Sequence, residues 1–98
     1  CRSAVELARD ADLLIHEATF AETDEPLAVR STHSTARMAA RVASEAGVRA
    51  LVLTHFSPRY FPGNETGPED LLREARSVFP ATELAHDFLS IDVERHVE

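Results

Sequence analysis

The stretch RALVLTH at residues 49–55 is the most informative part of the chain. A short, unbroken run of leucine and valine is typical of a strand buried on both faces, as in a parallel sheet. An earlier run, LLI at residues 13–15, has the same character. Titratable side chains follow both runs, since His16 and Glu17 come after the first and His55 ends the second. We therefore predict two buried strands whose carboxyl ends carry polar chemistry.

Helical patterns alternate with these strands. The middle helix is predicted to have Ser34 or Thr35 as its N-cap and Gly47 at its C-cap, and a later helix to start with a capping box of Thr66 and Glu69. The expected order, α-β-α-β-α-β-β, indicates a parallel α/β layer. The predicted helices and strands cover residues 3–11, 12–19, 33–47, 49–55, 66–79, 82–85 and 88–93, with loops at residues 20–32 and 56–67.

The composition narrows the class of protein. The chain has 98 residues and a formal charge of −7, because ten arginines are set against 17 acidic residues. A disordered tail, a collagen-like repeat and, with one cysteine, a disulfide scaffold are excluded. The scattered arginines form no basic stripe, which disfavours a nucleic-acid binder that acts alone. No apolar run approaches the ~20 residues of a membrane span, so we expect no membrane segment, and we expect the cytoplasm as the location.

Glu17, His33 and His55 are the candidate site residues. If the two buried strands are parallel neighbours, Glu17 and His55 lie at the same edge of the sheet, and the helix entry that carries His33 faces that edge. Each residue also has a plain structural interpretation: a capped histidine, a solvated turn residue or a neighbour of an N-cap. His86 and His96 are interpreted as ordinary surface residues.

Imidazole is the commonest nitrogen ligand of zinc, and zinc sites use three or four protein ligands. His55 is the one persuasive metal ligand in this sequence, which has no His-x-His, His-Glu-x-x-His or Cys-x-x-Cys motif. The residues themselves therefore predict that this chain alone does not complete a zinc site. No residue is assigned to an organic cofactor.

Three motifs resemble those of a known family. The segments His16-Glu17-Ala18-Thr19, His33-Ser34-Thr35 and Leu53-Thr54-His55-Phe56-Ser57, in this order, look like the C-terminal part of ribonuclease Z, the tRNA 3′-processing endonuclease of the metallo-β-lactamase fold. The Leu-Leu-x-Glu-Ala helix and the closing Asp87-Phe88-Leu89 also fit. The resemblance extends over nearly the whole chain.

The resemblance implies a fold and a set of roles. The fold would be the C-terminal half of an αββα sandwich, with residues 1–98 as a fragment of a single domain whose N-terminal part is absent. Two zinc ions would be bound in the full-length protein, with His55 as the last metal ligand. Glu17 and His33 match a catalytic pair that assists proton delivery to the leaving 3′-oxygen. The implied partners are precursor tRNA and a second subunit in a homodimer.

The departures from the family are equally informative. The His-x-His-x-Asp-His motif, the middle histidine ligand, the Gly-Asp-Thr segment and the basic arm that grips tRNA are absent from this sequence. Thr32 stands before His33 where the family often has glycine. Because Cys1 is not a methionine and a helical pattern follows it at once, we expect a segment of a longer chain that is inactive in isolation.

Two other hypotheses remain open. The first keeps the fold and changes the substrate, giving a metallo-hydrolase of small phosphodiesters or sulfate esters, because a fold does not determine its substrate. The second is a noncatalytic α/β module that folds alone or docks on a partner. It predicts that replacing His55 by alanine changes little beyond local packing.

Overall fold

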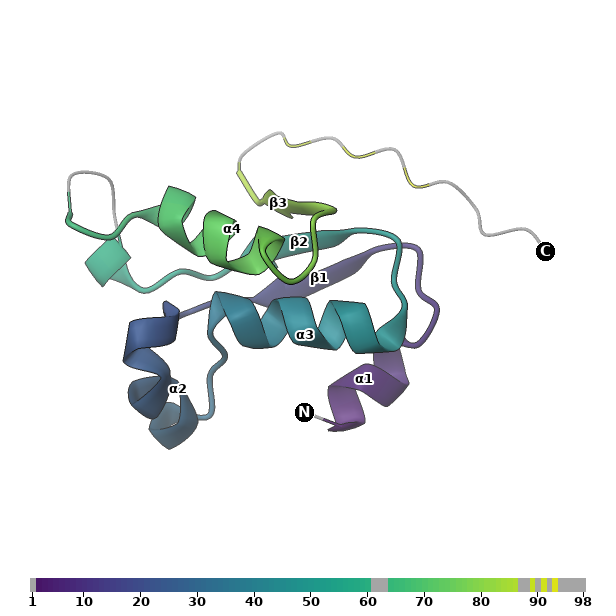
Figure 1. Ribbon diagram of the computed structural model, residues 1–98, viewed down its shortest axis with the longest axis horizontal. Helices are drawn as coiled ribbons and strands as arrows, with labels where there is room; N and C mark the ends of the chain where they lie inside the picture. Colours follow the sequence, from purple (N-terminus) through teal and green to yellow (C-terminus); the bar gives the residue numbers. More distant parts are fainter. Residues whose placement is uncertain (1, 61–63, 87–88, 90, 92, 94–98) are drawn as a thin grey trace.

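A computed structural model describes residues 2–60, 64–86, 89, 91 and 93. The described chain has four helices and a small sheet, whose arrangement Figure 1 shows. Within these described segments, no helix has the length and apolar character needed to cross a membrane. The elements are α1 (Arg2–Ala8), β1 (Leu14–Glu17), the 3₁₀ turn η1 (Glu22–Asp24), α2 (Glu25–Ser31), α3 (Ala36–Ala46), β2 (Leu51–Thr54), the 3₁₀ turn η2 (Pro58–Tyr60), α4 (Pro68–Arg76) and β3 (Thr82–Leu84).

The strands form a parallel sheet in the order β1-β2-β3. The β1–β2 register pairs Leu14 with Leu51 and Glu17 with Thr54, so the two strands end at the same level. This confirms the predicted parallel pairing. The further strand predicted at residues 88–93 falls partly outside the described residues, and its described members, Leu89, Ile91 and Val93, are not in a strand.

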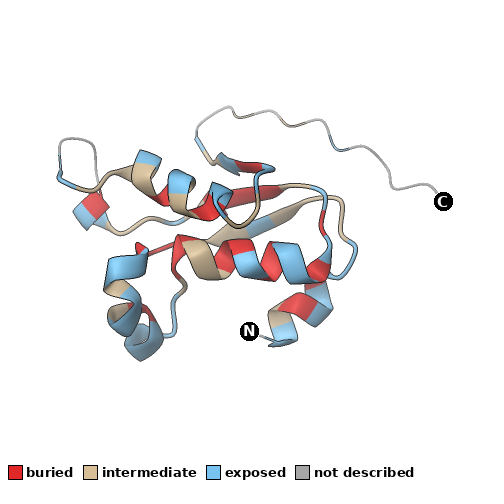
Figure 2. Cartoon of the chain, in the orientation of Figure 1, coloured by how far each residue is buried: buried red, intermediate tan, exposed pale blue. Residues whose placement is uncertain are grey.

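The core lies between the sheet and α3. This helix turns a buried face of small apolar residues toward β1, β2 and its two helical neighbours, α1 and α4. Figure 2 shows the buried residues of α3 in red. Alanine side chains let the helix lie close to the sheet, where Leu51 and Leu53 are fully buried. Burial of each leucine contributes on the order of 2 kcal/mol. The buried residues of α3 are Ala36, Ala39, Ala40, Val42, Ala43 and Ala46.

The caps of α3 confirm the prediction, and those of α4 correct it. The Thr35 hydroxyl accepts the Met38 N–H at 3.1 Å, and Gly47 closes the helix in the left-handed region with φ of 72°. The N-cap of α4 is Gly67 rather than Thr66. The residue three positions on is then Asp70, whose carboxylate accepts the Gly67 N–H at 2.8 Å.

The two faces of the sheet differ. Side chains alternate along a strand, so Leu14 packs into the core while its neighbour Ile15 points to the opposite face. Ile15 is 64% exposed, although the unbroken apolar run predicted a buried strand. That run indicates burial on both faces, whereas the helices packed on the core cover only the face that carries Leu14.

Residues 20–32 are more regular than the predicted loop, since they contain η1 and α2. Pro26 suggested a break, but it occupies the first turn of α2, where a missing N–H costs nothing. The helix ends at Thr32, which adopts the left-handed conformation with φ of 60° and ψ of 29°. A β-branched residue is strained there, and this strain lies directly before His33.

We expect Thr32→Gly to stabilise the chain by up to about 1.5 kcal/mol. Glycine removes a left-handed penalty of about 1–2 kcal/mol and adds an unfolded-state entropy cost of roughly 0.5–1 kcal/mol. Ser31→Gly is the matched control, because Ser31 is helical and its hydroxyl donates to the Leu27 carbonyl at 2.7 Å. Urea unfolding should move the two midpoints in opposite directions. Equal losses in both variants would contradict the assignment of strain to Thr32.

Candidate functional site

The candidate site lies where β1 and β2 end. Beyond Glu17, the Ala18 N–H donates to the Thr54 carbonyl at 2.8 Å. The next link joins the Ser57 N–H to the Thr19 carbonyl at 3.0 Å. The two exit loops therefore run side by side past the end of the sheet, which places Glu17 and His55 on adjacent segments.

His33 reaches the same place from the connection between α2 and α3. The Phe20 N–H donates to the Ser34 carbonyl at 3.2 Å, and the Ala36 N–H donates to the Phe20 carbonyl at 3.0 Å. A further bond joins the His33 N–H to the Ala28 carbonyl at 3.0 Å. The loop after β1 is thus hydrogen-bonded to both of its neighbours and holds them together.

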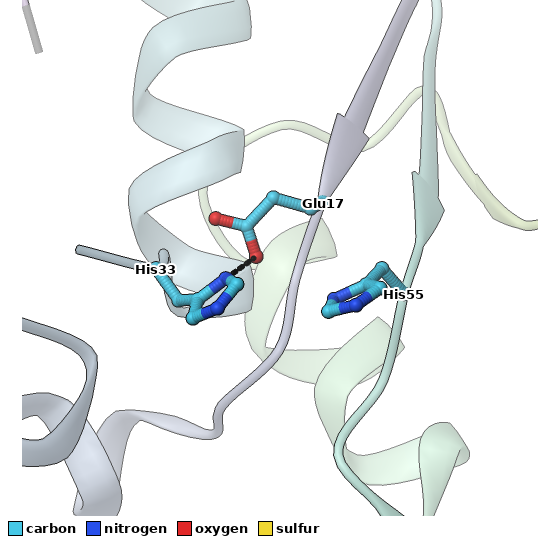
Figure 3. Close-up of side chains that lie close together, drawn as sticks. All are labelled: Glu17, His33 and His55. Carbon is cyan, nitrogen blue, oxygen red and sulfur yellow. Dashed lines mark ion pairs between the residues drawn. The ribbon is translucent and has the colours of Figure 1, made fainter. Parts of the chain in front are cut away.

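Glu17, His33 and His55 come together as the parallel pairing predicted. Their possible ligand atoms all lie within 4.8 Å of one another. Figure 3 shows the Glu17 carboxylate pointing toward the His33 ring, with the His55 ring just beyond the end of the neighbouring strand. The two imidazoles stack with centroids 5.4 Å apart and planes 16° apart. Glu17 is half-buried and both histidines are exposed, so the group is accessible to a ligand.

The Glu17 carboxylate is held by three donors. One oxygen, Oε1, accepts the Ser34 N–H at 2.6 Å, and Oε2 accepts the Thr19 N–H at 3.1 Å and the Thr19 hydroxyl at 2.6 Å. Burial raises the pKa of Glu17, but these hydrogen bonds outweigh burial and leave the pKa below its ordinary value. The same oxygen lies 3.6 Å from His33 Nδ1, so the carboxylate can stabilise a protonated His33.

Thr19 is the member of the site that sequence reasoning missed. Thr19 is buried, with 6% of the residue exposed. Its hydroxyl lies 2.8 Å from His55 Nδ1 and 3.3 Å from His33 Nδ1, and so connects all three candidate residues. Thr19 is named in the sequence analysis only as the last residue of the His16-Glu17-Ala18-Thr19 motif, with no role predicted for it. Its place two residues after Glu17 was the available signal, because alternate residues of an extended chain point the same way.

His55 is held in an unusual backbone conformation, with φ of 59°. A non-glycine residue in the left-handed region costs on the order of 1 kcal/mol or more, and such residues cluster at functional sites. The other histidines of the described chain lie outside this group. His16 Nδ1 contacts the Glu17 carbonyl at 2.7 Å, and His86 is exposed beyond β3. His96 lies outside the described residues.

Aromatic and charged side chains from η1, η2 and the loop after β1 lie beside His33. The Phe20 ring meets His33 edge-on at 6.4 Å, and the Arg59 guanidinium lies 5.6 Å from the Phe20 centroid. Arg59 pairs with Asp24 at 3.3 Å, and the Tyr60 hydroxyl donates to the same carboxylate. These contacts join η1 to η2 beside the site.

The donor set fits a metal such as zinc. Two imidazoles and one carboxylate are ligands that zinc accepts, and both rings present their Nδ1 atoms to Thr19, which leaves the other ring nitrogen without a bond to that hydroxyl. The sequence pointed to His55 alone, whereas the geometry places three donors within reach of one ion. A carboxylate beside an imidazole is also the arrangement that orients and stabilises a general acid.

No protein-family model matches the chain. Among curated proteins, ribonuclease Z of Synechococcus sp. (strain WH7803) is 62% identical over 93 residues, which are 95% of this chain and 29% of that protein. Ribonuclease Z of Nostoc sp. (strain PCC 7120) is 57% identical over 98 residues, which are 100% of this chain and 30% of that protein. The chain therefore spans about three tenths of the length of these relatives, and its resemblance to ribonuclease Z is confirmed.

Solved structures support the expected fold. The metallo-β-lactamase-fold protein YhfI from Bacillus subtilis has a TM-score of 0.75 and 30% identity, covering 87% of this chain and 32% of its own. The short form of human tRNase Z has a TM-score of 0.67 and 36% identity, covering 93% of this chain and 28% of its own. The chain thus has the α/β structure of one part of a metallo-β-lactamase fold.

We expect Tyr60 to titrate well above an ordinary tyrosine. Burial, and then the hydrogen bond to Asp24, raise the pKa of Tyr60 from 10.0 to about 12. The fold favours the neutral phenol, so this stabilisation is complete below pH 10.0 and is lost as the pH rises through about 12. Tyr60 is the chain's one tyrosine and there is no tryptophan, so tyrosinate absorbance reports it directly.

Asp24→Asn should lower this midpoint because it removes both the accepting carboxylate and its charge. The matched control is Glu25→Gln, an exposed neighbouring acid, which should leave it unchanged. Circular dichroism during the titration shows whether the chain is still folded. A midpoint near 10 in the folded wild-type chain would show that Tyr60 is not held as described.

Proposed function

We propose that the chain is the C-terminal part of a zinc-dependent endoribonuclease that processes the 3′ ends of tRNA precursors. The observation that carries this proposal is the convergence of Glu17, His33 and His55 in a chain 62% identical to a ribonuclease Z. Residues 1–98 would be one segment of a single domain, and the rest of a longer protein would complete the site.

His55 is assigned as a metal ligand. Its position at the end of a core strand holds the imidazole in place, and its exposure keeps one edge of the ring open. Zinc, when bound, supplies Lewis-acid stabilisation of the charge that develops on the scissile phosphate. Two zinc ions need more ligands than this chain provides, so the isolated chain is expected to be inactive.

His33 and Glu17 are assigned to proton transfer. An exposed imidazole can approach the leaving 3′-oxygen and give it a proton, which avoids the release of an alkoxide. Glu17, 3.6 Å away, favours the protonated ring and orients it. The three donors on the carboxylate keep it ionised and fixed, which suits this supporting role.

The remaining parts of the proposal concern the longer protein. A charge of −7 does not attract RNA, so the positive surface that binds precursor tRNA would come from the metal ions and from segments beyond this chain. A cytoplasmic location and a homodimer complete the proposal, and the homodimer follows from the ribonuclease Z resemblance alone.

A second candidate is a metallo-hydrolase of small phosphodiesters or sulfate esters. It rests on the fold: YhfI, described only as a metallo-β-lactamase-fold protein, matches with a TM-score of 0.75, human tRNase Z matches with 0.67, and a fold does not determine its substrate. The catalytic assignments of Glu17, His33 and His55 are the same for both candidates. The substrate separates them.

A chimera tests the function. In it, this chain replaces the matching 93 residues of the Synechococcus ribonuclease Z, and cleavage of a precursor tRNA is measured. We expect the chimera to cleave at the 3′ end. His55→Ala should abolish cleavage, and His33→Ala and Glu17→Gln should lower kcat, the former by about 10²–10⁴-fold. His86→Ala is the matched histidine control and should retain activity.

The contradicting outcomes are distinct. A His55→Ala chimera that cleaves like the parent chimera would overturn the metal assignment and favour the noncatalytic module. A chimera that hydrolyses a small phosphodiester such as bis-p-nitrophenyl phosphate but leaves precursor tRNA intact would favour the second candidate.

Zinc titration of the isolated chain tests the ligand assignment separately. If His55 is the ligand and His33 and Glu17 serve the proton, we expect weak zinc binding that His55→Ala removes and His33→Ala leaves unchanged. Competition with a chromogenic chelator measures the affinity. Tight binding that is lost in both variants would instead show that His33 and His55 hold one ion together.

A further inference from the structure

The Thr19 hydroxyl has more partners than one hydrogen atom can serve. It lies 2.6 Å from Glu17 Oε2, 2.8 Å from His55 Nδ1 and 3.3 Å from His33 Nδ1. A hydroxyl has one hydrogen to donate and two lone pairs that accept. The three contacts therefore use its full capacity, and the direction of each bond can be worked out.

The hydrogen goes to Glu17. Both oxygens of that carboxylate already accept backbone N–H groups, from Ser34 on Oε1 and from Thr19 itself on Oε2, so the group acts as an acceptor. If the hydroxyl donated elsewhere, two oxygens would face each other at 2.6 Å with no hydrogen between them. The contact to Glu17 is also the shortest of the three. The two lone pairs of Thr19 then remain for the histidines.

We propose that Thr19 is a positioning residue that fixes His33 and His55 in the Nδ1–H tautomer and leaves the Nε2 of each ring unprotonated when the ring is neutral. Each Nδ1 donates to a lone pair of the same hydroxyl. Neutral histidine in water favours the opposite tautomer, with the proton on Nε2. The hydrogen-bond partner of one ring nitrogen determines the state of the other.

The burial of Thr19 protects its hydrogen bonds to the two rings from competition by water. Thr19 is 6% exposed, so water has little access to replace the hydroxyl as the partner of either ring. The backbone on both sides of Thr19 is also fixed, since its N–H donates to Glu17 and its carbonyl accepts the Ser57 N–H. One side chain therefore sets the tautomer of two rings that stack 5.4 Å apart.

The consequence for the reaction rests on the proposed function. His55 would present a lone pair on Nε2 to the metal. A protonated His33 would give up its Nε2 proton while Nδ1–H stays hydrogen-bonded to Thr19, with Glu17 Oε2 3.6 Å away. Support of this kind from a residue behind a metal ligand is commonly worth 10–100-fold in affinity or activity.

Nitrogen NMR of the metal-free chain tests the tautomers without any activity assay. Long-range ¹H–¹⁵N spectra of ¹⁵N-labelled chain, at a pH where the rings are neutral, distinguish a protonated from an unprotonated ring nitrogen. We expect Nδ1 to be protonated in His33 and His55. Thr19→Ser keeps the hydroxyl and should keep both tautomers, whereas Thr19→Val removes it and should return the rings to the Nε2–H form.

The wild-type spectrum alone can overturn the proposal, whether or not Thr19→Val folds. An Nε2–H tautomer in either His33 or His55 would do so, and so would a folded Thr19→Val chain with unchanged tautomers. In the chimera, Thr19→Val should lower cleavage by about 10–100-fold and Thr19→Ser should restore it. Tautomers as expected in an inactive chimera would refute the proposed function and leave this inference standing.

Discussion

The parallel register of β1 and β2 is the constraint on which the candidate site depends. Pairing Glu17 with Thr54 makes both strands end at one level, and the exit loops continue the contact through the Ala18 and Ser57 amides. A shift of one residue would turn every β1 side chain to the other face of the sheet. Glu17 would then leave the site, while Ile15 would enter the core against α3.

A network of polar side chains adds to this backbone geometry and restricts how the site's side chains can move. Glu17 receives three donors, and one hydroxyl from Thr19 contacts both imidazoles. Two left-handed residues, Thr32 and His55, stand beside this network. Strain of on the order of 1 kcal/mol at each position is tolerated only when the surroundings hold the chain in place, and here the hydrogen bonds between the loops do so.

Sequence reasoning predicted what depends on local pattern. The positions of β1 and β2, the helix cap at Ser34 or Thr35 and the convergence of Glu17 and His55 followed from apolar runs, from capping preferences and from the rule that parallel strands end together. The burial of β1 did not, because Ile15 is exposed. It missed features that depend on contacts between segments. Residues around Pro26 were predicted to form a loop, because the sequence does not distinguish a proline that interrupts a helix from one in its first turn. Thr19 had no predicted role because its partners lie 14 and 36 residues away.

The acidic charge of the chain and a phosphate substrate are compatible because of where the charges lie. Glu17 is the one acid among the clustered residues, and its charge is directed at two amides, a hydroxyl and His33 rather than at solvent. Arg59, at the edge of the site, is paired with Asp24 and contributes little free positive charge. In the proposed function, attraction of a phosphodiester would come from the metal and from segments beyond this chain. This chain would hold the ring nitrogens of His33 and His55, and one proton, in fixed positions. The net charge of the chain does not affect that role.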